Sequence, residues 1–165
     1  MTTAHGQLFI VAAPSGAGKT SLVQSLVSRL DHLKISISHT TRAKRPLEKN
    51  GVNYFFIDTD QFQQMIEQDA FLEYANVFNC QYGTSKAWVF DQLRQGTDII
   101  LEIDWQGANQ IKQQFPQAQS IFILPPSLAE LVQRLKKRQQ DDSATIEYRM
   151  KQAQDEMEHY VEFDY

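Results

Sequence analysis

The chain has 165 residues, of which 42% are hydrophobic and 22% charged, and its formal net charge is −4. Its length and composition fit one compact domain with a core of its own, and its acidic balance argues against a general binder of nucleic-acid polymers, which usually presents a basic surface. The single cysteine, Cys80, rules out an intrachain disulfide framework, and no apolar run approaches the length of a membrane span. We therefore expect a cytoplasmic protein whose partners include neither a membrane nor a nucleic-acid polymer.

The chain begins with a pattern typical of a strand, a tight loop and a helix. The apolar run at 7–13 is bounded by Gly6 and Pro14 and predicts a buried strand. Apolar residues then recur at helical spacing over 19–30. A second strand is predicted at 34–38, which gives the opening the element order of an α/β fold.

The segment 36–92 differs in character and is predicted to be an insertion with a small sheet of its own. Its polar, basic start leads to a turn at Asn50-Gly51 and a strand-like run. Thr59 or Asp60 is expected to cap the helix that follows. The remaining predicted elements are a strand-like run at 70–78 and a helix at 85–96.

The second half of the chain alternates strands with helices. The predicted elements are a strand at 98–104, a helix at 105–114, a strand at 120–124, and helices at 128–138 and 144–160. Ser127 and Glu130 have the spacing of a capping box at the start of the fourth of these elements. Strands that alternate with helices indicate a parallel sheet with helices packed on it, so the predicted fold class is α/β.

A glycine-rich segment joins the first strand to the first helix. It reads APSGAGKT at 13–20, close to the phosphate-loop pattern G-x-x-x-x-G-K-[ST] in the strand-to-helix context that the pattern requires. Ala13 stands where the pattern has its first glycine. This departure matters only if the position needs a positive φ, a conformation that alanine resists.

The chemistry of such a loop is the binding of phosphate oxygens by backbone N–H groups and by the helix N-terminus. Lys19 would add a positive charge beside the β- and γ-phosphates, and the Thr20 hydroxyl would bind Mg²⁺. The residues of this predicted phosphate-binding loop are Ala13, Pro14, Ser15, Gly16, Ala17, Gly18, Lys19 and Thr20. The alternative interpretation is an ordinary glycine-rich turn.

Two acidic residues, Glu102 and Asp104, stand near the carboxyl end of the strand predicted at 98–104. Their i, i+2 spacing directs both side chains to the same side of that strand. Ligands of open α/β sheets bind beyond the carboxyl ends of the strands, where a carboxylate can hold Mg²⁺ through water or a polar group of the ligand. The alternative is a solvated strand end, and the nearby phosphate loop favours the functional interpretation.

Arginines occur in two groups. Arg42 and Arg45 lie three positions apart in the polar loop of the insertion, where two guanidinium groups can bind one phosphate. Arg134, Arg138 and Arg149 flank the polar break at 139–145, as cations on a lid over a transferring phosphoryl group would. Spacing alone also permits a solvated basic loop and ordinary charge on a helix surface.

Seven segments, taken together and in this order, closely resemble guanylate kinases of the bacterial type. They are APSGAGKT, SHTTR, GVNYFF, AFLEYA, YGTS, EIDWQGA and SIFILPPS, and the resemblance runs from Gln7 to Tyr165. It implies a P-loop NTPase core of three layers with a parallel sheet, an inserted GMP-binding subdomain and a lid. The implied reaction moves the γ-phosphate of ATP to GMP, with Mg²⁺, in purine nucleotide metabolism and GMP recycling.

The resemblance also divides the chain into parts. The core would comprise about 1–35, 93–137 and 147–165, the GMP-binding insertion about 36–92, and the lid about 138–146. Members of the family usually continue past Phe163-Asp164-Tyr165 into a further strand and a last helix, which the sequence does not contain. Glu102 stands where the family usually has an aspartate, and Gln139 replaces a glycine that often follows the lid arginine.

Residue roles follow from the same resemblance, which implies that residues 13–20 bind the phosphates of ATP. Lys19, Arg134, Arg138 and Arg149 would be catalytic, and Thr20 would bind Mg²⁺ with Glu102 in support. The implied GMP-binding residues are Ser38, Arg42, Arg45, Tyr54, Glu73, Tyr82, Thr84 and Asp104. A carboxylate at position 73 can accept hydrogen bonds from guanine N1–H and from the 2-amino group, a pair of donors that adenine lacks.

Two other functions remain open from the sequence. One is a non-catalytic guanylate-kinase-like module that binds partner proteins, although such modules have usually lost the phosphate loop that Gly18-Lys19-Thr20 preserves. The other is a P-loop kinase for a different small acceptor, and Glu73 together with Asp104 argues against AMP as that acceptor.

Overall fold

The computed structural model describes residues 5–137 and 143–165. Its first sheet has the strand order β2-β7-β1-β8, and all neighbouring strands in it are parallel. The strands are β1 (Leu8–Ala12), β2 (Leu33–Ile35), β7 (Asp98–Glu102) and β8 (Gln119–Phe122). This arrangement confirms the predicted α/β fold with a parallel sheet, although β2 begins one residue earlier than predicted and already ends at Ile35.

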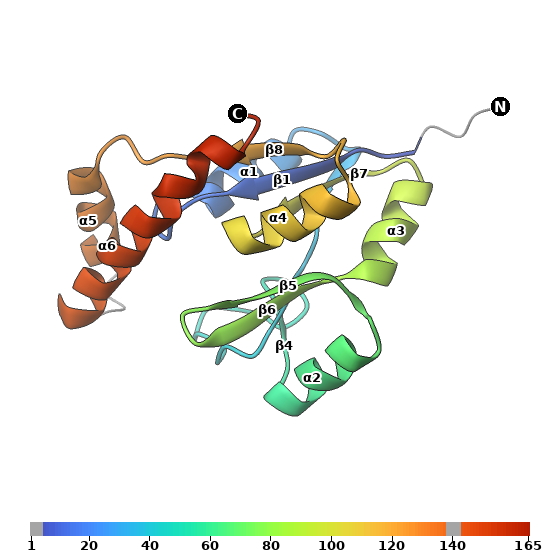
Figure 1. The fold of residues 1–165 in the computed structure, drawn as a ribbon, viewed down its shortest axis with the longest axis horizontal. Coiled ribbons are helices and arrows are strands. Elements are labelled where there is room, and N and C mark those ends of the chain that lie inside the picture. Colours follow the sequence, from blue (N-terminus) through green and yellow to red (C-terminus); the bar gives the residue numbers. More distant parts are fainter. Residues whose placement is uncertain (1–4, 138–142) are drawn as a thin grey trace.

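Helices cover both faces of this sheet (Figure 1). On one face Ile10, Ile99 and Leu101 pack with residues of α3 (Lys86–Arg94) and α4 (Trp105–Gln114). On the other face Val11 and Ile100 pack with residues of α1 (Lys19–Val27). Successive residues of β1 and β7 thus point into opposite cores, which explains why β1 and the middle of β7 (99–101) are apolar without interruption.

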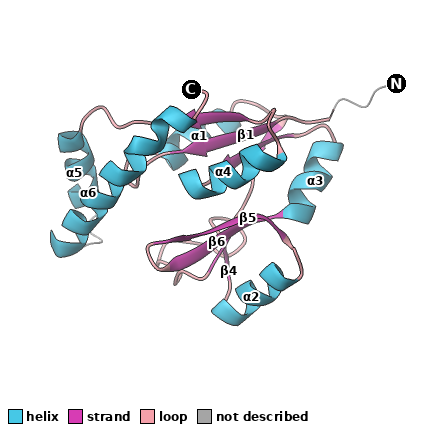
Figure 2. Ribbon diagram, in the orientation of Figure 1, coloured by secondary structure: helices cyan, strands magenta, loops and turns pink. Residues whose placement is uncertain are grey.

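A second sheet is built from residues between the two halves of the first (Figure 2). Its strand order is β4-β3-β6-β5, with β3 (His39–Thr40), β4 (Phe55–Phe56), β5 (Phe71–Val77) and β6 (Cys80–Ser85). Helix α2 (Thr59–Glu67) packs on it through Phe62, whose ring centroid lies 4.5 Å from that of Phe71. Helix α4 contacts both sheets. Its apolar side packs on the first sheet, and its Gln110 and Gln114 amides donate to backbone oxygens of β5 in the second.

Two local features of this second sheet differ from the sequence-based expectations. Strand β6 was not among the predicted elements, because its hairpin turn consists of Phe78 and Asn79, with φ of 51° and 60°, instead of a recognisable Asn-Gly or Gly-Gly pair. The cap of α2 is Asp58, not Thr59 or Asp60. Its carboxylate accepts from the Gln61 backbone N–H, and the Gln61 side chain accepts from the Asp58 backbone in return.

The chain ends in two helices that pack together beside the first sheet. Helix α5 (Leu128–Lys137) and helix α6 (Ser143–Glu158) share a cluster formed by Leu131, Leu135 and Ala153, and a 3₁₀ turn, η1 (His159–Glu162), follows. Residues 138–142, which include Arg138 and most of the predicted lid, lie outside the described residues. Within the part of the chain that is described, none of the helices has both the length and the apolar composition needed to cross a membrane.

Candidate functional site

The phosphate-loop segment connects the end of β1 to the first residue of α1. Gly16 and Gly18 adopt φ values of 94° and 102°, which only glycine reaches without strain, whereas Ala13 is not among the residues with positive φ. Alanine therefore fits the position of the first glycine in the pattern. Gly18 is the N-cap of α1 and supplies no side-chain cap, so the first N–H groups of this helix are available to an anionic ligand.

Lys19 and Thr20 reach from α1 to the carboxyl end of β7. The Lys19 Nζ donates to the Ile103 carbonyl at 3.4 Å, and the Thr20 hydroxyl donates to Glu102 Oε2 at 3.1 Å. Burial lowers the pKa of Lys19, and the carboxylates of Glu102 and Asp104 oppose that shift. The structure thus brings the loop and the two acidic residues together, as the sequence predicts.

One oxygen of Glu102 has a notable environment. Its Oε1 atom is buried and has no hydrogen-bond partner among the described residues, while Oε2 faces the Thr20 hydroxyl. Buried carboxylate oxygens are rarely left without a partner, and carboxylate and hydroxyl oxygens are the ligands that Mg²⁺ prefers. The donor set therefore fits a divalent metal ion held beside the loop.

Arg134 connects helix α5 to the phosphate loop. Its Nη1 donates to the Ala17 carbonyl at 2.9 Å, and its Nε donates to Glu130 Oε1 at 3.0 Å. The loop also packs on α5, since a Cβ atom added at Gly16 would lie 3.0 Å from a methyl group of Leu131. The arrangement holds a guanidinium group directly against the loop, which spacing in the sequence alone did not establish.

A buried carboxylate on the second sheet lies against the first turn of α4. Glu73 on β5 is only 3% exposed and pairs in the sheet with Thr84 on β6, whose hydroxyl donates to Glu73 Oε1 at 2.5 Å. Desolvation raises the pKa of Glu73 to about 7, against the lowering effect of the Thr84 hydrogen bond. Asp104 adds to the increase. Asp104 caps the turn of α4 that lies against Glu73, so the structure brings Glu73, Thr84 and Asp104 close together.

The first turn of α4 packs against the Glu73 carboxylate. Asp104 is the N-cap of α4 and accepts from the Gly107 backbone N–H at 2.9 Å and from the Gln106 side chain at 2.9 Å. A Cβ atom added at Gly107 would lie 2.5 Å from Glu73 Oε2. Gly107 thus gives the Glu73 carboxylate its space. Sequence reasoning missed this residue because a glycine inside a predicted helix gives no sign of what it contacts.

Gly107→Ala is expected to weaken the binding of any ligand recognised by Glu73 and to leave the fold largely intact. The added methyl group meets the end of a side chain that can turn away, so the carboxylate moves while the backbone stays in place. We expect urea unfolding free energies within about 1 kcal/mol of wild type. The matched control is Gln113→Ala, an exposed position on the same helix, and equal ligand affinity in the two variants would contradict this role of Gly107.

The raised pKa of Glu73 also predicts how stability depends on pH. The unfolded carboxyl titrates near 4.5 and the folded one near 7, so between these values the folded state holds a proton that the unfolded state has lost. Stability should therefore fall as pH rises from about 5 to 7.5, by an amount on the order of 3 kcal/mol. Urea unfolding at several pH values measures this slope, and Glu73→Gln should reduce it. A slope identical in both proteins would refute the assignment.

Residues of the second sheet and the loop before it form a third cluster, the arginine–tyrosine cluster of Arg42, Arg45, Tyr54 and Tyr82. The Arg42 guanidinium lies 5.3 Å from the centroid of the Tyr54 ring, and the rings of Tyr54 and Tyr82 meet edge to face at 5.9 Å. Arg42 also donates to Glu48 Oε1 at 2.6 Å, and the Arg45 backbone N–H donates to Glu48 Oε2 at 2.8 Å. The structure thus joins the predicted residues and adds Glu48, which no sequence pattern indicated.

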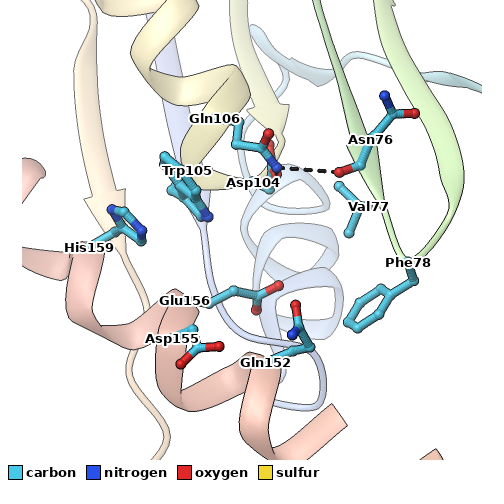
Figure 3. A pocket seen from close by; sticks show the side chains of 10 residues that line it. All are labelled: Asn76, Val77, Phe78, Asp104, Trp105, Gln106, Gln152, Asp155, Glu156 and His159. Atoms are coloured by element: carbon cyan, nitrogen blue, oxygen red, sulfur yellow. Dashed lines mark hydrogen bonds between the residues drawn. The ribbon is translucent and has the colours of Figure 1, made fainter. Parts of the chain in front are cut away.

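A polar cavity of about 170 Å³ lies between α6, the start of α4 and the β5–β6 hairpin (Figure 3). Gln106 of α4 donates across it to the Asn76 carbonyl at 3.3 Å, and the rings of Trp105 and His159 stack at 3.6 Å. Glu156 of α6 also lines the cavity. Burial raises its pKa to about 7, Asp104 adds to the increase, and Lys19 and the Ser15 backbone oppose it.

The two remaining described residues of the predicted site are Arg149 and Ser38. Arg149 of α6 has its guanidinium 5.9 Å from the centroid of the Phe78 ring, at the tip of the β5–β6 hairpin. Ser38 directly precedes β3, and its carbonyl accepts from the Phe55 backbone N–H at 2.9 Å. Arg149 therefore lies beside the β5–β6 hairpin in this structure, whereas Arg134 contacts the phosphate loop.

Comparisons with known proteins agree with this geometry. The family model described as guanylate kinase matches residues 5–165. The chain is 61% identical to the guanylate kinase of Coxiella burnetii over 96% of its own length and 77% of that protein, and 60% identical to that of Alcanivorax borkumensis over 97% and 77%. The crystal structure of guanylate kinase from Anaplasma phagocytophilum matches with a TM-score of 0.77 and 31% identity, over 98% of this chain and 76% of that one.

These matches span nearly the whole chain, and they include every described element that forms the phosphate loop, the buried carboxylate pocket and the arginine–tyrosine cluster. A likeness of this extent and identity is far beyond what a shared fold alone produces. The chain therefore belongs to the guanylate kinase family.

Proposed function

We propose that this chain transfers the γ-phosphate of ATP to GMP, giving ADP and GDP, with Mg²⁺ as the metal ion and the cytoplasm as the location. The observation that carries the proposal is that Lys19 connects the phosphate loop with the residues around Glu73. Lys19 of the phosphate loop donates to the carbonyl of Ile103, the residue before Asp104, and the turn of α4 that Asp104 caps lies against Glu73. A donor held by the loop and an acceptor held by the pocket would thus share one cleft.

On the donor side, the residues 13–20 would bind the phosphates of ATP. The uncapped N–H groups at the start of α1 favour negative charge. Lys19 supplies a cation that burial keeps poorly solvated, and a poorly solvated cation interacts strongly with an arriving phosphate. Arg134 would act on the same phosphates, because its guanidinium is already fixed against the loop carbonyl of Ala17.

On the acceptor side, Glu73, Thr84, Asp104 and Ser38 would surround the guanine base. When ionised, Glu73 would accept from guanine N1–H and from the 2-amino group. The Thr84 hydroxyl donates to Glu73 Oε1 and so fixes the orientation of this carboxylate. Adenine offers no such pair of donors, so the buried carboxylate would be left without partners, a costly arrangement. Arg42, Arg45, Tyr54 and Tyr82 would bind the phosphate of GMP.

Thr20 and Glu102 would hold Mg²⁺ at the edge of the phosphate loop, consistent with the unpartnered Glu102 oxygen. When bound, this ion would neutralise charge on the phosphate oxygens of ATP. Glu102 extends one methylene farther than an aspartate would. Its contact with the Thr20 hydroxyl nevertheless supports the same role for the longer side chain.

The reaction needs no strong base, because phosphoryl transfer is accelerated mainly by positioning, charge neutralisation and the exclusion of water. We assign charge neutralisation to Lys19, Arg134, Arg138 and Arg149. The segment 138–146 would close over the phosphates as a lid, and 36–92 would form the GMP-binding insertion on a core of 1–35, 93–137 and 147–165.

The test is an assay of ADP formation with ATP and Mg²⁺ in the presence of GMP, AMP, CMP or no acceptor. We expect turnover that depends on GMP and is at least about a hundredfold slower with AMP. Absence of turnover with every acceptor would favour a non-catalytic binding module, and faster turnover with AMP would overturn only the guanine assignment.

A further inference from the structure

Glu48 lies at the centre of the arginine–tyrosine cluster and has no assigned role in the reaction. Its Oε1 accepts from Arg42 Nη2 at 2.6 Å, and its Oε2 accepts from the Arg45 backbone N–H at 2.8 Å. The Glu48 backbone N–H also donates to the Arg45 carbonyl at 3.1 Å. One side chain thus ties together the two arginines that the proposed function assigns to the phosphate of GMP.

The environment makes this contact stronger than an ordinary surface ion pair. The side chains of Arg42 and Glu48 are only 16% and 15% exposed, whereas fully solvated pairs contribute little. Partial burial alone would raise the pKa of Glu48, but the hydrogen bonds from Arg42 and from the Arg45 backbone hold it below its ordinary value. Glu48 is therefore a fixed anion, and Arg42 is held in one orientation.

A fixed anion at this place can act in two ways. It can occupy the phosphate position and compete with GMP, or it can hold the loop and Arg42 ready for the phosphate. The contacts favour the second, because one oxygen of Glu48 is used within its own turn by the Arg45 backbone. An arginine carries five N–H donors, and Arg42 uses one on Glu48 and one on the Ala43 carbonyl. The guanidinium also lies 5.3 Å from the centroid of the Tyr54 ring, and Tyr82 interacts with it as well.

We propose that Glu48 is a positioning residue that orients the Arg42 guanidinium and the Arg45 turn, and that it thereby sets the affinity for the phosphate of the acceptor nucleotide. This inference rests on the proposed function, since it takes GMP as the acceptor. The contribution is preorganisation: without Glu48, binding would have to order the Arg42 side chain and the loop at that moment.

The experiment compares Glu48→Ala, Glu48→Gln and the control Glu67→Gln, an exposed carboxylate at the end of α2. Removing a charge-assisted hydrogen bond of this kind costs roughly tenfold in affinity. We expect Glu48→Ala to raise the KM for GMP about tenfold, with kcat and the KM for ATP within about twofold of wild type. Glu48→Gln keeps one acceptor oxygen of the two and should give an intermediate value.

Two further measurements separate positioning from a general loss of structure. Guanosine lacks the phosphate, so its dissociation constant, measured by calorimetry, should be the same in wild type and Glu48→Ala. In the background of Arg42→Ala, adding Glu48→Ala should change the KM for GMP much less than in wild type, because both act through the same guanidinium.

The outcomes are distinct. A lower KM for GMP in Glu48→Ala would show that Glu48 competes with the phosphate, and equal weakening of GMP and guanosine would show a structural role; either result overturns the inference. An unchanged KM overturns it as well. If wild type itself shows no turnover that depends on GMP, the proposed function fails, and that result is recognised before any variant is compared.

Discussion

Lys19→Ala is expected to reduce turnover by a factor of at least about 100 while the affinity for GMP stays within about twofold of wild type. Lys19 is the cation that reaches from α1 to the end of β7, and its ammonium group contacts the Ile103 carbonyl. Its charge would be used mainly when negative charge shifts toward the transferring phosphoryl group, so its removal should lower kcat more than it raises the KM for ATP.

The split between the two substrates makes this prediction specific. On the proposed assignment, GMP would bind residues of the second sheet and Asp104, none of which uses Lys19 as a hydrogen-bond donor. Kinetics at varied ATP and GMP, with calorimetry of GMP binding, measure both sides. The control is Lys151→Ala, an exposed lysine on α6. A variant that keeps turnover but loses GMP affinity would contradict the assignment of Lys19 to the donor.

The removal of Lys19 should also change the pKa of nearby carboxyl groups. Lys19 lowers the pKa of both Glu73 and Glu156, which burial raises to about 7 in each case. Without this cation both groups would hold their protons to higher pH. The charges of Lys19, Glu73 and Glu156 thus depend on one another, and a bound nucleotide would change all three.

The parts of the site that sequence reasoning predicted well are those encoded locally. The phosphate loop lies within eight consecutive residues at 13–20, and its strand-to-helix context is visible in the apolar pattern on either side. The parallel sheet was predictable from the apolar runs at the centres of β1 and β7, since both of its faces are buried. In these regions the local pattern and the tertiary structure require the same residues.

The residues that were missed depend on contacts between distant segments or on side-chain conformation. Gly107 matters because the Glu73 carboxylate of another element occupies the space beside it. Glu48 matters because its side chain folds back on the Arg45 turn and at the same time reaches Arg42. Strand β6 escaped prediction because Phe78 adopts a φ of 51°, a conformation that its residue type does not indicate.

Glu73→Gln is expected to lower kcat/KM for GMP by roughly 100-fold or more and to bring the preference for GMP over AMP down with it. The glutamine amide keeps one acceptor oxygen, but it places an N–H₂ group where the guanine also presents a donor. Because Glu73 is 3% exposed, water cannot replace the lost acceptor. The loss should therefore exceed that caused by an exposed Glu→Gln change such as Glu67→Gln.

The pH dependence of the same preference gives a second, independent readout. In the empty pocket the pKa of Glu73 is about 7, and only the ionised carboxylate accepts from both guanine donors. The preference of the wild-type protein for GMP over AMP should thus strengthen between pH 6 and about pH 8, while in Glu73→Gln it should stay flat over that range. AMP carries the same phosphate, so titration of the phosphate cancels in the ratio of kcat/KM values. A preference that strengthens equally in both proteins would assign the guanine recognition to a different group, and Asp104, which caps α4 directly beside Glu73, would be the first to examine.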